Sequence, residues 1–442
     1  MHQATDPTSR PNPYMPSRAQ GWYVVALMTL LLALSFTDRM VLALLAEPVI
    51  AAFNLSDGQL ALLIGAGFSV VYSVGGLPLA DRVDRGNRIV VVVLGVAVWC
   101  LMTIGSGFAT SFIGLLIMRA GVALGESVLT PAAVSLIADH FPPERRAAPT
   151  ALYGSMASIM STGSFLIAGA ALAFSGDIEH ITHLEPWRMT LVLVGAPGLV
   201  VGALFAFTVR DRFRRADRDK PAKSDVSFGA VLHHLGTSKG FYFPFYLGMG
   251  LITMVSTGFI SWLPTMLIRS HGFNTDSAGL WAGSVGLPAG ITAAFLWPFI
   301  AERIRRRGRP DGSLFALVFA SLLSGAALAF FPWLPNMNFV AVFLYVALIG
   351  LAPVAVLVPI ALQTYGPRLM RARLTSIYLI CTSLIGYALG PLAIVEVAGF
   401  WGKQPDALQY GMISTGVVLA IASAICFALS ILGARNMASD HG

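Results

Sequence analysis

The stretch "LADRVDRGNR" at residues 79–88 has a counterpart in "IAERIRRRGR" at residues 300–309. Each follows an apolar segment, and in the alignment acid stands opposite acid and arginine opposite arginine: Asp81 with Glu302, Arg82 with Arg303, and Arg85 with Arg306. Self-similarity between distant parts of a chain indicates a repeated structural unit. We therefore expect two halves built on one plan.

The composition is that of an integral membrane protein. Of the 442 residues, 56% are hydrophobic and only 12% are charged, and the mean hydropathy is +0.73. A soluble domain has about 25% charged residues. The net charge of +7 comes from short basic runs beside apolar segments, which orient a membrane protein, so we expect no nucleic-acid partner. The three cysteines have neither metal nor disulfide spacing, and we expect no metal and no cofactor.

Apolar segments of about 20 residues are typical of membrane-spanning helices. The sequence predicts twelve, at residues 21–47, 57–80, 89–109, 112–139, 147–175, 187–209, 241–268, 277–301, 312–331, 339–363, 374–399 and 408–432. The loops between them alternate between rich and poor in Lys and Arg. The positive-inside rule therefore predicts that both termini face the cytoplasm.

These segments predict an all-α membrane protein with 12 transmembrane helices in two pseudo-symmetric six-helix bundles. The expected parts are a disordered cytoplasmic tail (1–20), a first bundle (21–209), a basic cytoplasmic linker (210–240), a second bundle (241–434) and a cytoplasmic tail (435–442). Two related halves around a central cavity are an architecture of secondary transporters, which hold substrate near the membrane midplane.

The spanning region and the loop at 79–88 resemble the major facilitator superfamily, although Leu77 and Asp84 stand where the family's loop commonly has glycine. This resemblance implies the major facilitator fold and a cytoplasmic gate made by charged loop residues. We assign to that gate Asp81, Arg82, Arg85, Asp139, Arg145, Arg146, Glu302 and Arg303. The alternative is that these charges only set the topology.

Four ionisable residues lie inside predicted spans: Asp38 and Arg39 in "FTDRM" (36–40), and Arg119 and Glu126 in the fourth span. Each such residue costs about 2.5–3.5 kcal/mol at a helix centre, so it needs a reason. At a rise of about 1.5 Å per residue, Asp38, Arg39 and Arg119 share a level, and Glu126 lies about two turns deeper on the same face as Arg119. We expect all four to face a water-accessible chamber. The alternative is that Asp38 pairs with Arg119 only to hold two helices together.

These residue types suit transport of an anion with protons. A guanidinium at Arg119 or Arg39 binds phosphate or carboxylate, and a carboxyl at Glu126 or Asp38 exchanges a proton. The second half has no charge near mid-span; it offers aromatic rings, many of them expected to be packing, and small hydroxyls: Trp262, Phe295, Trp297, Phe343, Tyr378, Ser256, Thr257, Thr382 and Ser383. Charge on one wall and apolar surface on the other favours a lipid with an anionic or zwitterionic head.

The stretch "MRAGVALGESVLTPAAVSLIADHFPPERR" (118–146), together with "FTDRM", resembles the spinster branch of the superfamily in its bacterial type. This resemblance implies proton-coupled movement of a lysophospholipid or sphingoid phosphate. It places the proton sites at Asp38 and Glu126 and the headgroup at Arg119. We add Arg39 as a second residue that binds the headgroup.

Two other functions stay open. Organic-anion/proton symporters of the same fold share Trp187-Arg188 and the "SWLPTML" stretch (261–267). An intramembrane lipid-modifying enzyme would use Glu126 and Asp38 as acid and base, but duplicated halves favour transport, so we expect no enzyme. The expected partners are the lipid or organic-anion substrate, protons and membrane lipids. We expect a multi-pass monomer in a bacterial inner membrane.

Overall fold

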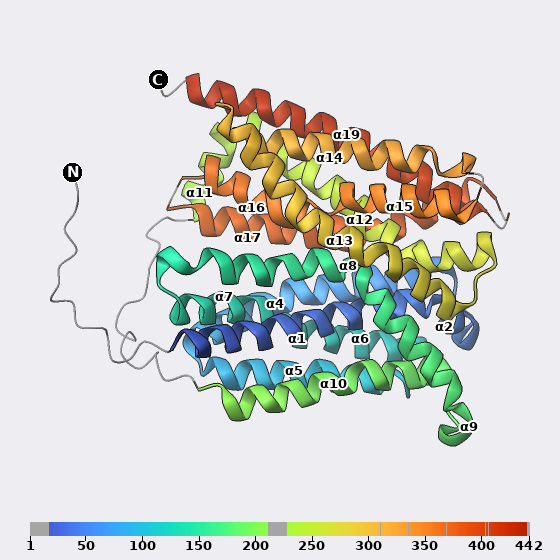
Figure 1. Ribbon diagram of the computed structural model, residues 1–442. Coiled ribbons are helices and arrows are strands. Elements are labelled where there is room, and N and C mark those ends of the chain that lie inside the picture. The colour runs from blue at the N-terminus through green and yellow to red at the C-terminus, as the bar shows by residue number, and fades with distance from the viewer. Residues whose placement is uncertain are drawn as a thin grey trace.

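The computed structural model describes residues 17–210, 228–309, 311–334, 336–367, 369–402, 404 and 406–439. Within these residues the chain is helical and contains no strand. Long helices run side by side in two stacked groups (Figure 1). The expected all-α architecture is therefore confirmed.

The first half contains six spans, some of them made of more than one helix. In chain order they are α1 (Arg18–Leu44); α3 (Asp57–Ala61), η1 (Leu62–Ala66) and α4 (Gly67–Arg85); α5 (Arg88–Ser106); α6 (Phe112–Glu126) and α7 (Leu129–His140); α8 (Ala147–Asp177); and α10 (Pro186–Thr208). Short helices α2 (Ala46–Phe53) and α9 (Glu179–Thr182) lie between spans.

The second half repeats this plan after the connecting helix α11 (Phe228–Thr237). Its spans are α12 (Lys239–His271); α13 (Thr275–Arg306); α14 (Gly312–Ala329); α15 (Met337–Leu351) and α16 (Val354–Tyr365); α17 (Arg371–Cys381), η5 (Thr382–Tyr387) and α18 (Ala388–Gly399); and α19 (Ala407–Ser439). Among the described residues, 11 helices are long and apolar enough to cross a membrane. The remaining span is interrupted between α15 and α16, where Pro353 lacks the N–H that a continuous helix would use.

The ends of the bundles differ slightly from the predicted boundaries. Helix α1 begins at Arg18, because Ser17 and Gln20 form a reciprocal capping box there. Helix α19 continues to Ser439, past the predicted boundary at 435. The polar part of the predicted linker, residues 211–227, lies outside the described residues, as do residues 1–16 of the N-terminal tail.

Two of the contacts between the halves are close approaches of their backbones. At the first, α13 lies against α8: a Cβ added to Gly283 would come within 2.2 Å of the backbone N of Leu166. At the second, the π-helical turns η1 and η5 lie against each other, and the Ser383 hydroxyl donates to the Ser69 carbonyl across the interface at 3.1 Å. Both contacts bring backbone close to backbone, so they define how the halves approach.

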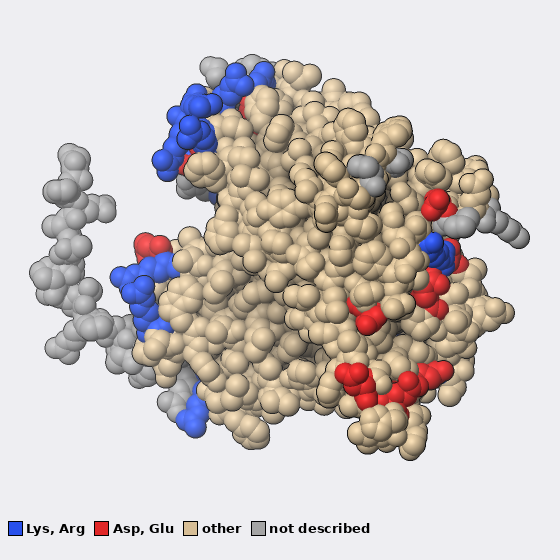
Figure 2. All heavy atoms as spheres, turned by 45° about the vertical axis from the view of Figure 1, so that its right-hand side comes forward, with Lys and Arg blue, Asp and Glu red and all other residues tan. Residues whose placement is uncertain are grey.

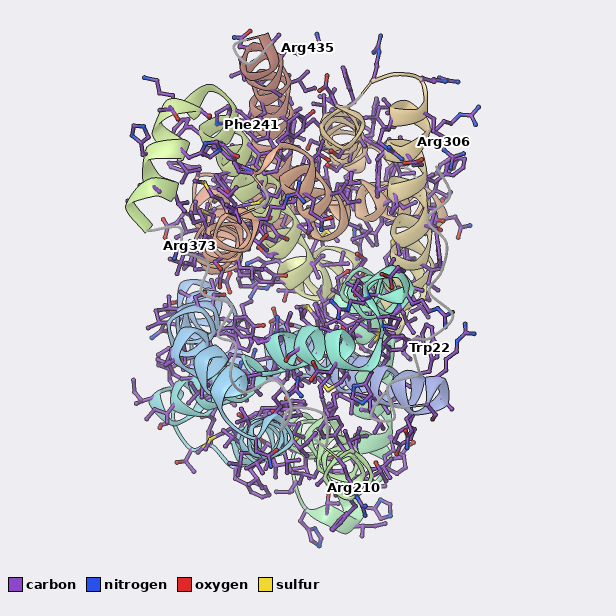
Figure 3. The ribbon with its side chains drawn as sticks, turned by 90° about the vertical axis from the view of Figure 1, so that its left-hand side faces the viewer. Trp22, Arg210, Phe241, Arg306, Arg373 and Arg435 are labelled. Atoms are coloured by element: carbon purple, nitrogen blue, oxygen red, sulfur yellow. The ribbon has the colours of Figure 1, made fainter. Side chains whose placement is uncertain are left out.

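The molecule has two chemically different ends, which we call the basic end and the acidic end. The basic end carries the start of α1 and the end of α19; Figure 3 looks onto it, with Arg306, Arg373 and Arg435 on the second half and Trp22 and Arg210 on the first. Acidic side chains gather at the opposite end (Figure 2). The space-filling surface is hollowed between the two halves at the basic end, so the halves part on that side.

Candidate functional site

A cavity of about 60 Å³ lies between the two halves. The first half lines it with Phe36, Arg39, Met40, Ala43, Ile64, Phe68, Arg119 and Ser161. Arg39 and Arg119 are the charged residues of the lining, so the cavity presents positive charge to an occupant.

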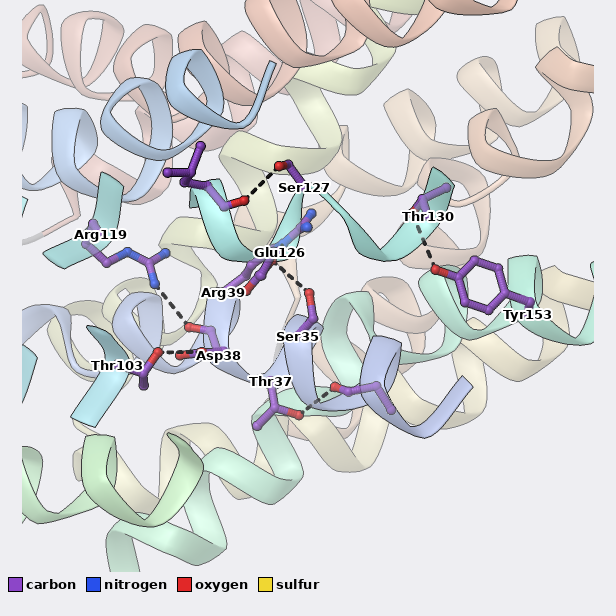
Figure 4. Close-up of polar contacts among 12 residues, drawn as sticks. Ser35, Thr37, Asp38, Arg39, Thr103, Arg119, Glu126, Ser127, Thr130 and Tyr153 are labelled. Carbon is purple, nitrogen blue, oxygen red and sulfur yellow. Dashed lines mark hydrogen bonds and ion pairs between the residues drawn. The ribbon is translucent and has the colours of Figure 1, made fainter. Parts of the chain in front are cut away.

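Arg39 is held by a carboxylate and by aromatic rings. Its Nε donates to Glu126 Oε2 at 2.6 Å, and the Ser35 hydroxyl donates to the same oxygen at 2.7 Å (Figure 4). The guanidinium carbon lies 4.8 Å from the ring centroids of both Phe68 and Tyr72, within cation–π distance. Glu126 is fully buried, whereas the Arg39 side chain is 12% exposed. Arg39 therefore reaches the cavity and Glu126 supports it from behind.

Asp38 points away from Arg39, toward α5. Its Oδ2 accepts a hydrogen bond of 2.5 Å from the Thr103 hydroxyl, while its Oδ1 is buried without a partner (Figure 4). Arg119 Nη1 donates to the main-chain oxygen of Asp38 at 3.3 Å. The described side chains thus show Arg119 bound to the backbone of α1 and no Asp38–Arg119 ion pair. The alternative in which Asp38 pairs with Arg119 only to hold two helices together is therefore not observed among these side chains.

The four ionisable residues lie together, as expected from their depth, but they do not all face the chamber. Arg39 and Arg119 line the cavity. Asp38 and Glu126 are 1% and 0% exposed, and both lie behind the lining. The prediction that all four face the chamber is therefore wrong for the two carboxyls, because adjacent residues on a helix point about 100° apart and Glu126 turns toward α1.

The Glu126 position depends on close packing between α5 and α6. Glu126 is the last residue of α6, and the preceding Gly125 lies against α5: a Cβ there would come within 2.5 Å of the Gly95 carbonyl oxygen. Any larger residue at 125 would push the two helices apart. The glycine lets α6 carry Glu126 up to the face of α1 that bears Ser35 and Arg39.

The second-half wall differs from the apolar wall that the sequence predicts. None of the five aromatics named above lines the cavity; Trp262 and Trp297 are fully buried and donate to backbone carbonyls, and Phe295 is exposed on the outside. The wall instead consists of Ser256, Thr257, Ile260, Ser261, Tyr387 and Pro391, four of which carry a hydroxyl. Of the small hydroxyls predicted here, Ser256 and Thr257 line the cavity and Thr382 and Ser383 do not. The predicted wall differs from the observed one because the lining depends on which helix faces turn toward the cavity. Hydropathy does not contain that information.

Comparison with known proteins identifies the family. The model of the Major Facilitator Superfamily matches residues 28–391. This chain belongs to the Major Facilitator Superfamily. It is 30% identical to an MFS-type efflux pump of Mycolicibacterium smegmatis over 74% of this chain and 73% of that protein. It is 23% identical to the hexuronate transporter of Bacillus subtilis over 64% of this chain and 66% of that protein.

The solved structures confirm the resemblance to the spinster branch. A crystal structure of a bacterial homologue of the human lysosomal transporter spinster matches with a TM-score of 0.77 and 26% identity, over 96% of this chain and 99% of that one. That protein was captured inward-facing and unoccupied. The expected major facilitator fold is confirmed, and the chain is a transporter-family protein and not an enzyme.

A cluster at the acidic end of this superfamily member joins the two halves, and sequence reasoning missed it. Arg269, near the end of α12, donates from Nε to Glu47 of α2 at 2.7 Å. It also binds both carboxylate oxygens of Asp57 of α3, at 2.7 and 2.8 Å. The signal for it was Arg269 itself, a rare basic residue among loops that are otherwise poor in Lys and Arg.

At the basic end, the ion pairs among the described side chains stay within one half. Asp139 pairs with Arg88, and Glu302 pairs with Arg305 and Arg306 on its own helix. Arg146 donates to carbonyls of its own half, and Arg145 and Arg303 are exposed. The side chains of Asp81, Arg82 and Arg85 lie outside the described residues. The gate that these residues were expected to form stays a prediction.

Proposed function

We propose that this protein is a proton-coupled secondary transporter that carries an amphipathic lipid with an anionic or zwitterionic head, of the lysophospholipid or sphingoid phosphate type, by alternating access. Arg39 and Arg119 bind the head in the central cavity. Glu126 and Asp38 are the proton sites. The substrate enters from the basic end while the Arg269 cluster closes the acidic end.

The Arg39–Glu126 pair at the cavity wall carries this proposal. An anionic head that reaches Arg39 competes with Glu126 for the same guanidinium. Once displaced, Glu126 would be a buried carboxylate without a cationic partner, which is costly. Taking up a proton removes that cost. Anion binding and protonation of Glu126 therefore favour each other.

This linkage determines whether the substrate and the proton move in the same direction or in opposite directions. Because each binding event strengthens the other by the same factor, substrate and proton occupy the protein together. The carrier then moves both in one direction, which is symport. Asp38, on α1, is a second proton site, since its Oδ1 has no hydrogen-bond partner in its buried position.

A small organic anion is a second candidate substrate. The hydroxyl-bearing wall of the second half suits a polar solute better than the apolar wall that the sequence predicts. The hexuronate transporter of Bacillus subtilis, a relative by sequence, is named for such an anion. Both candidates share an anionic group for Arg39 and Arg119.

The test is transport by the purified full chain in proteoliposomes, with a fluorescent lysophosphatidate and with radiolabelled glucuronate as probes. An acidic pH on the side of probe addition should accelerate transport of one probe, and a protonophore should abolish the acceleration. Transport of neither probe, or transport that ignores the pH gradient, would contradict the proposal.

Arg119→Ala tests the binding role separately. This variant should weaken binding of the transported probe by about tenfold or more, because hydrogen bonds to a charged group contribute about 1.5–3 kcal/mol. Binding is measured by titration of purified protein. The exposed Arg307, at the basic end and away from the cavity, supplies the matched control Arg307→Ala. Equal binding by both variants would remove Arg119 from the site.

A further inference from the structure

Two serine hydroxyls that α12 places at the cavity differ from the threonine hydroxyls beside them. Thr253 and Thr257 donate to the carbonyls one turn earlier, Met249 at 2.8 Å and Thr253 at 2.9 Å, as serine and threonine commonly do in membrane helices. The hydroxyls of Ser256 and Ser261 have no hydrogen-bond partner among the described residues. Both serines line the cavity. Both hydroxyls are therefore available to a molecule in the cavity.

Ser261 is largely enclosed by protein and still borders the cavity. The residue is only 7% exposed, and it lines the cavity. Its hydroxyl oxygen is not among the buried unpaired atoms, so it borders the cavity and is free to form a hydrogen bond there. A water molecule or a polar group of a bound molecule would satisfy it.

The two serines stand on one face of α12. Positions 256, 257, 260 and 261 are spaced as neighbours on one helix surface, and all four line the cavity. This face belongs to the second half, whereas Arg39 and Arg119 belong to the first. An occupant of the cavity thus meets guanidinium donors on one side and hydroxyl groups on the other.

We propose that Ser256 and Ser261 bind a hydroxyl group of the substrate next to the anionic group held by Arg39 and Arg119, so that the substrate is a hydroxylated anion. This inference rests on the proposed function and narrows its substrate class. Two sources share the chemistry: a lysolipid phosphate with a free glycerol hydroxyl, and a sugar acid with hydroxyls beside its carboxylate. A site built to hydrogen-bond a hydroxyl discriminates against the analogue that lacks it, because the protein groups are then left unpaired.

The experiment compares probes that differ in their hydroxyls, using the full chain in proteoliposomes. One pair is 1-oleoyl lysophosphatidate and its 2-deoxy analogue; the other is glucuronate and hexanoate. For one pair, the wild type should prefer the hydroxylated member in kcat/KM by about tenfold, the effect of one or two hydrogen bonds. The preferred pair identifies whether the source is a lipid or a sugar acid.

Variants then assign the preference to the two serines. Ser256→Ala/Ser261→Ala should bring the ratio of hydroxylated to deoxy transport close to one. The matched control is Ser284→Ala, because Ser284 is an exposed serine of α13 whose hydroxyl donates to the Trp281 carbonyl at 2.8 Å. This control should keep the wild-type ratio. Thermal unfolding of each purified variant checks that the fold is retained, and the single variants Ser256→Ala and Ser261→Ala replace the double variant if it unfolds.

The outcomes separate this inference from the proposed function. Transport without discrimination in either pair would overturn the hydroxyl site and leave the transporter in place. Discrimination that survives in the serine variants would overturn the assignment to these residues. A lack of binding of all four probes by the purified protein would overturn both.

Discussion

At the scale of single residues, Arg39 lies where an anion in the cavity can compete with Glu126 for its guanidinium. Arg39 binds Glu126 on one side and borders the cavity on the other. A buried ion pair is weak evidence for stability, since desolvation offsets most of the attraction. Breaking the Arg39–Glu126 pair, however, leaves a buried charge without a partner. We therefore expect binding of an anion at Arg39 to be accompanied by neutralisation of Glu126.

The first prediction follows from this exchange. Glu126→Gln keeps the size and hydrogen-bonding ability of the side chain but removes its charge, so it mimics the protonated carboxyl. We expect the variant to bind the anionic probe at every pH as tightly as the wild type does at low pH. Its transport should lose the dependence on a pH gradient. Binding titrations and proteoliposome transport across a range of pH measure both.

A control for this prediction is Glu185→Gln, which removes a carboxylate that pairs with Arg188 at 2.7 Å near the acidic end, away from the cavity. It should retain the wild-type pH dependence. Glu126→Gln protein that still accumulates probe in response to a pH gradient would eliminate Glu126 as a coupling site.

At the scale of elements, α12 is tied to α2 and α3 by the Arg269 cluster. The three side chains are each about one quarter to one third exposed, at 26%, 29% and 32%, so solvent screens the pairing. A pair of this kind contributes about 0.2–1 kcal/mol, and a bidentate cluster lies toward the upper end. That is sufficient to shift the balance between two states of a transporter by a few fold.

The second prediction tests this closure. Asp57→Asn removes the bidentate partner of Arg269 and should increase opening at the acidic end. A cysteine placed at Ala43, which lines the cavity, reports the opening through its rate of labelling by a membrane-impermeant maleimide. The native Cys100, Cys381 and Cys426 are replaced by alanine beforehand. We expect labelling from the acidic side to be about two- to fivefold faster than in the parent.

Glu185→Gln serves again as the comparison, since Glu185 pairs with Arg188 within one half. It should leave the labelling rate unchanged. The closure role fails if the Asp57 and Glu185 variants label equally fast.

The third prediction concerns the contact between α8 and α13. Because a Cβ at Gly283 would overlap the backbone of Leu166, Gly283→Ala should force the two helices apart and lower the transport rate. Gly154 of α8 has no atom within 4 Å of its added Cβ, so Gly154→Ala is the matched control and should transport normally. Initial rates in proteoliposomes measure the difference. Full activity of the Gly283 variant would show that this contact tolerates separation.

At the scale of the whole molecule, the basic end is also the end at which the two halves part. Basic residues gather at the end where the surface is hollowed between the halves (Figure 2), and the Arg269 cluster joins the halves at the acidic end. From the positive-inside rule we expect the basic end to face the cytoplasm. The conformation would then be open to the cytoplasm, as in the inward-facing crystal structure of the bacterial spinster homologue.

The fourth prediction tests this orientation. A green fluorescent protein fused to the C-terminus should fluoresce, and an alkaline phosphatase fused there should be inactive, because both reporters would lie in the cytoplasm. A fusion inserted after Asp177, at the acidic end of α8, should give the opposite pattern. The reverse result would invert the topology and with it the direction in which the cavity opens.

The sequence by itself determined the properties that are local or additive along the chain. Hydropathy located the spans, the matching loops at 79–88 and 300–309 revealed the two halves, and the rise per residue placed Asp38, Arg39 and Arg119 at one depth. These inferences succeed because a lipid environment forces each spanning segment to satisfy its own backbone hydrogen bonds. The length and composition of a segment are then sufficient to predict a helix.

Only the tertiary structure decided which side chains meet. The rotation of α1 turned Arg39 toward Glu126 and the cavity, and turned the carboxyl of Asp38 toward Thr103. The packing of α12 brought its serine face to the cavity and enclosed Trp262, and it carried Arg269 to acids 212 and 222 residues away in the chain. The physical reason is that helix rotation and approach depend on contacts between all neighbouring helices, including the close passages at glycines such as Gly125 and Gly283. No single segment contains that information.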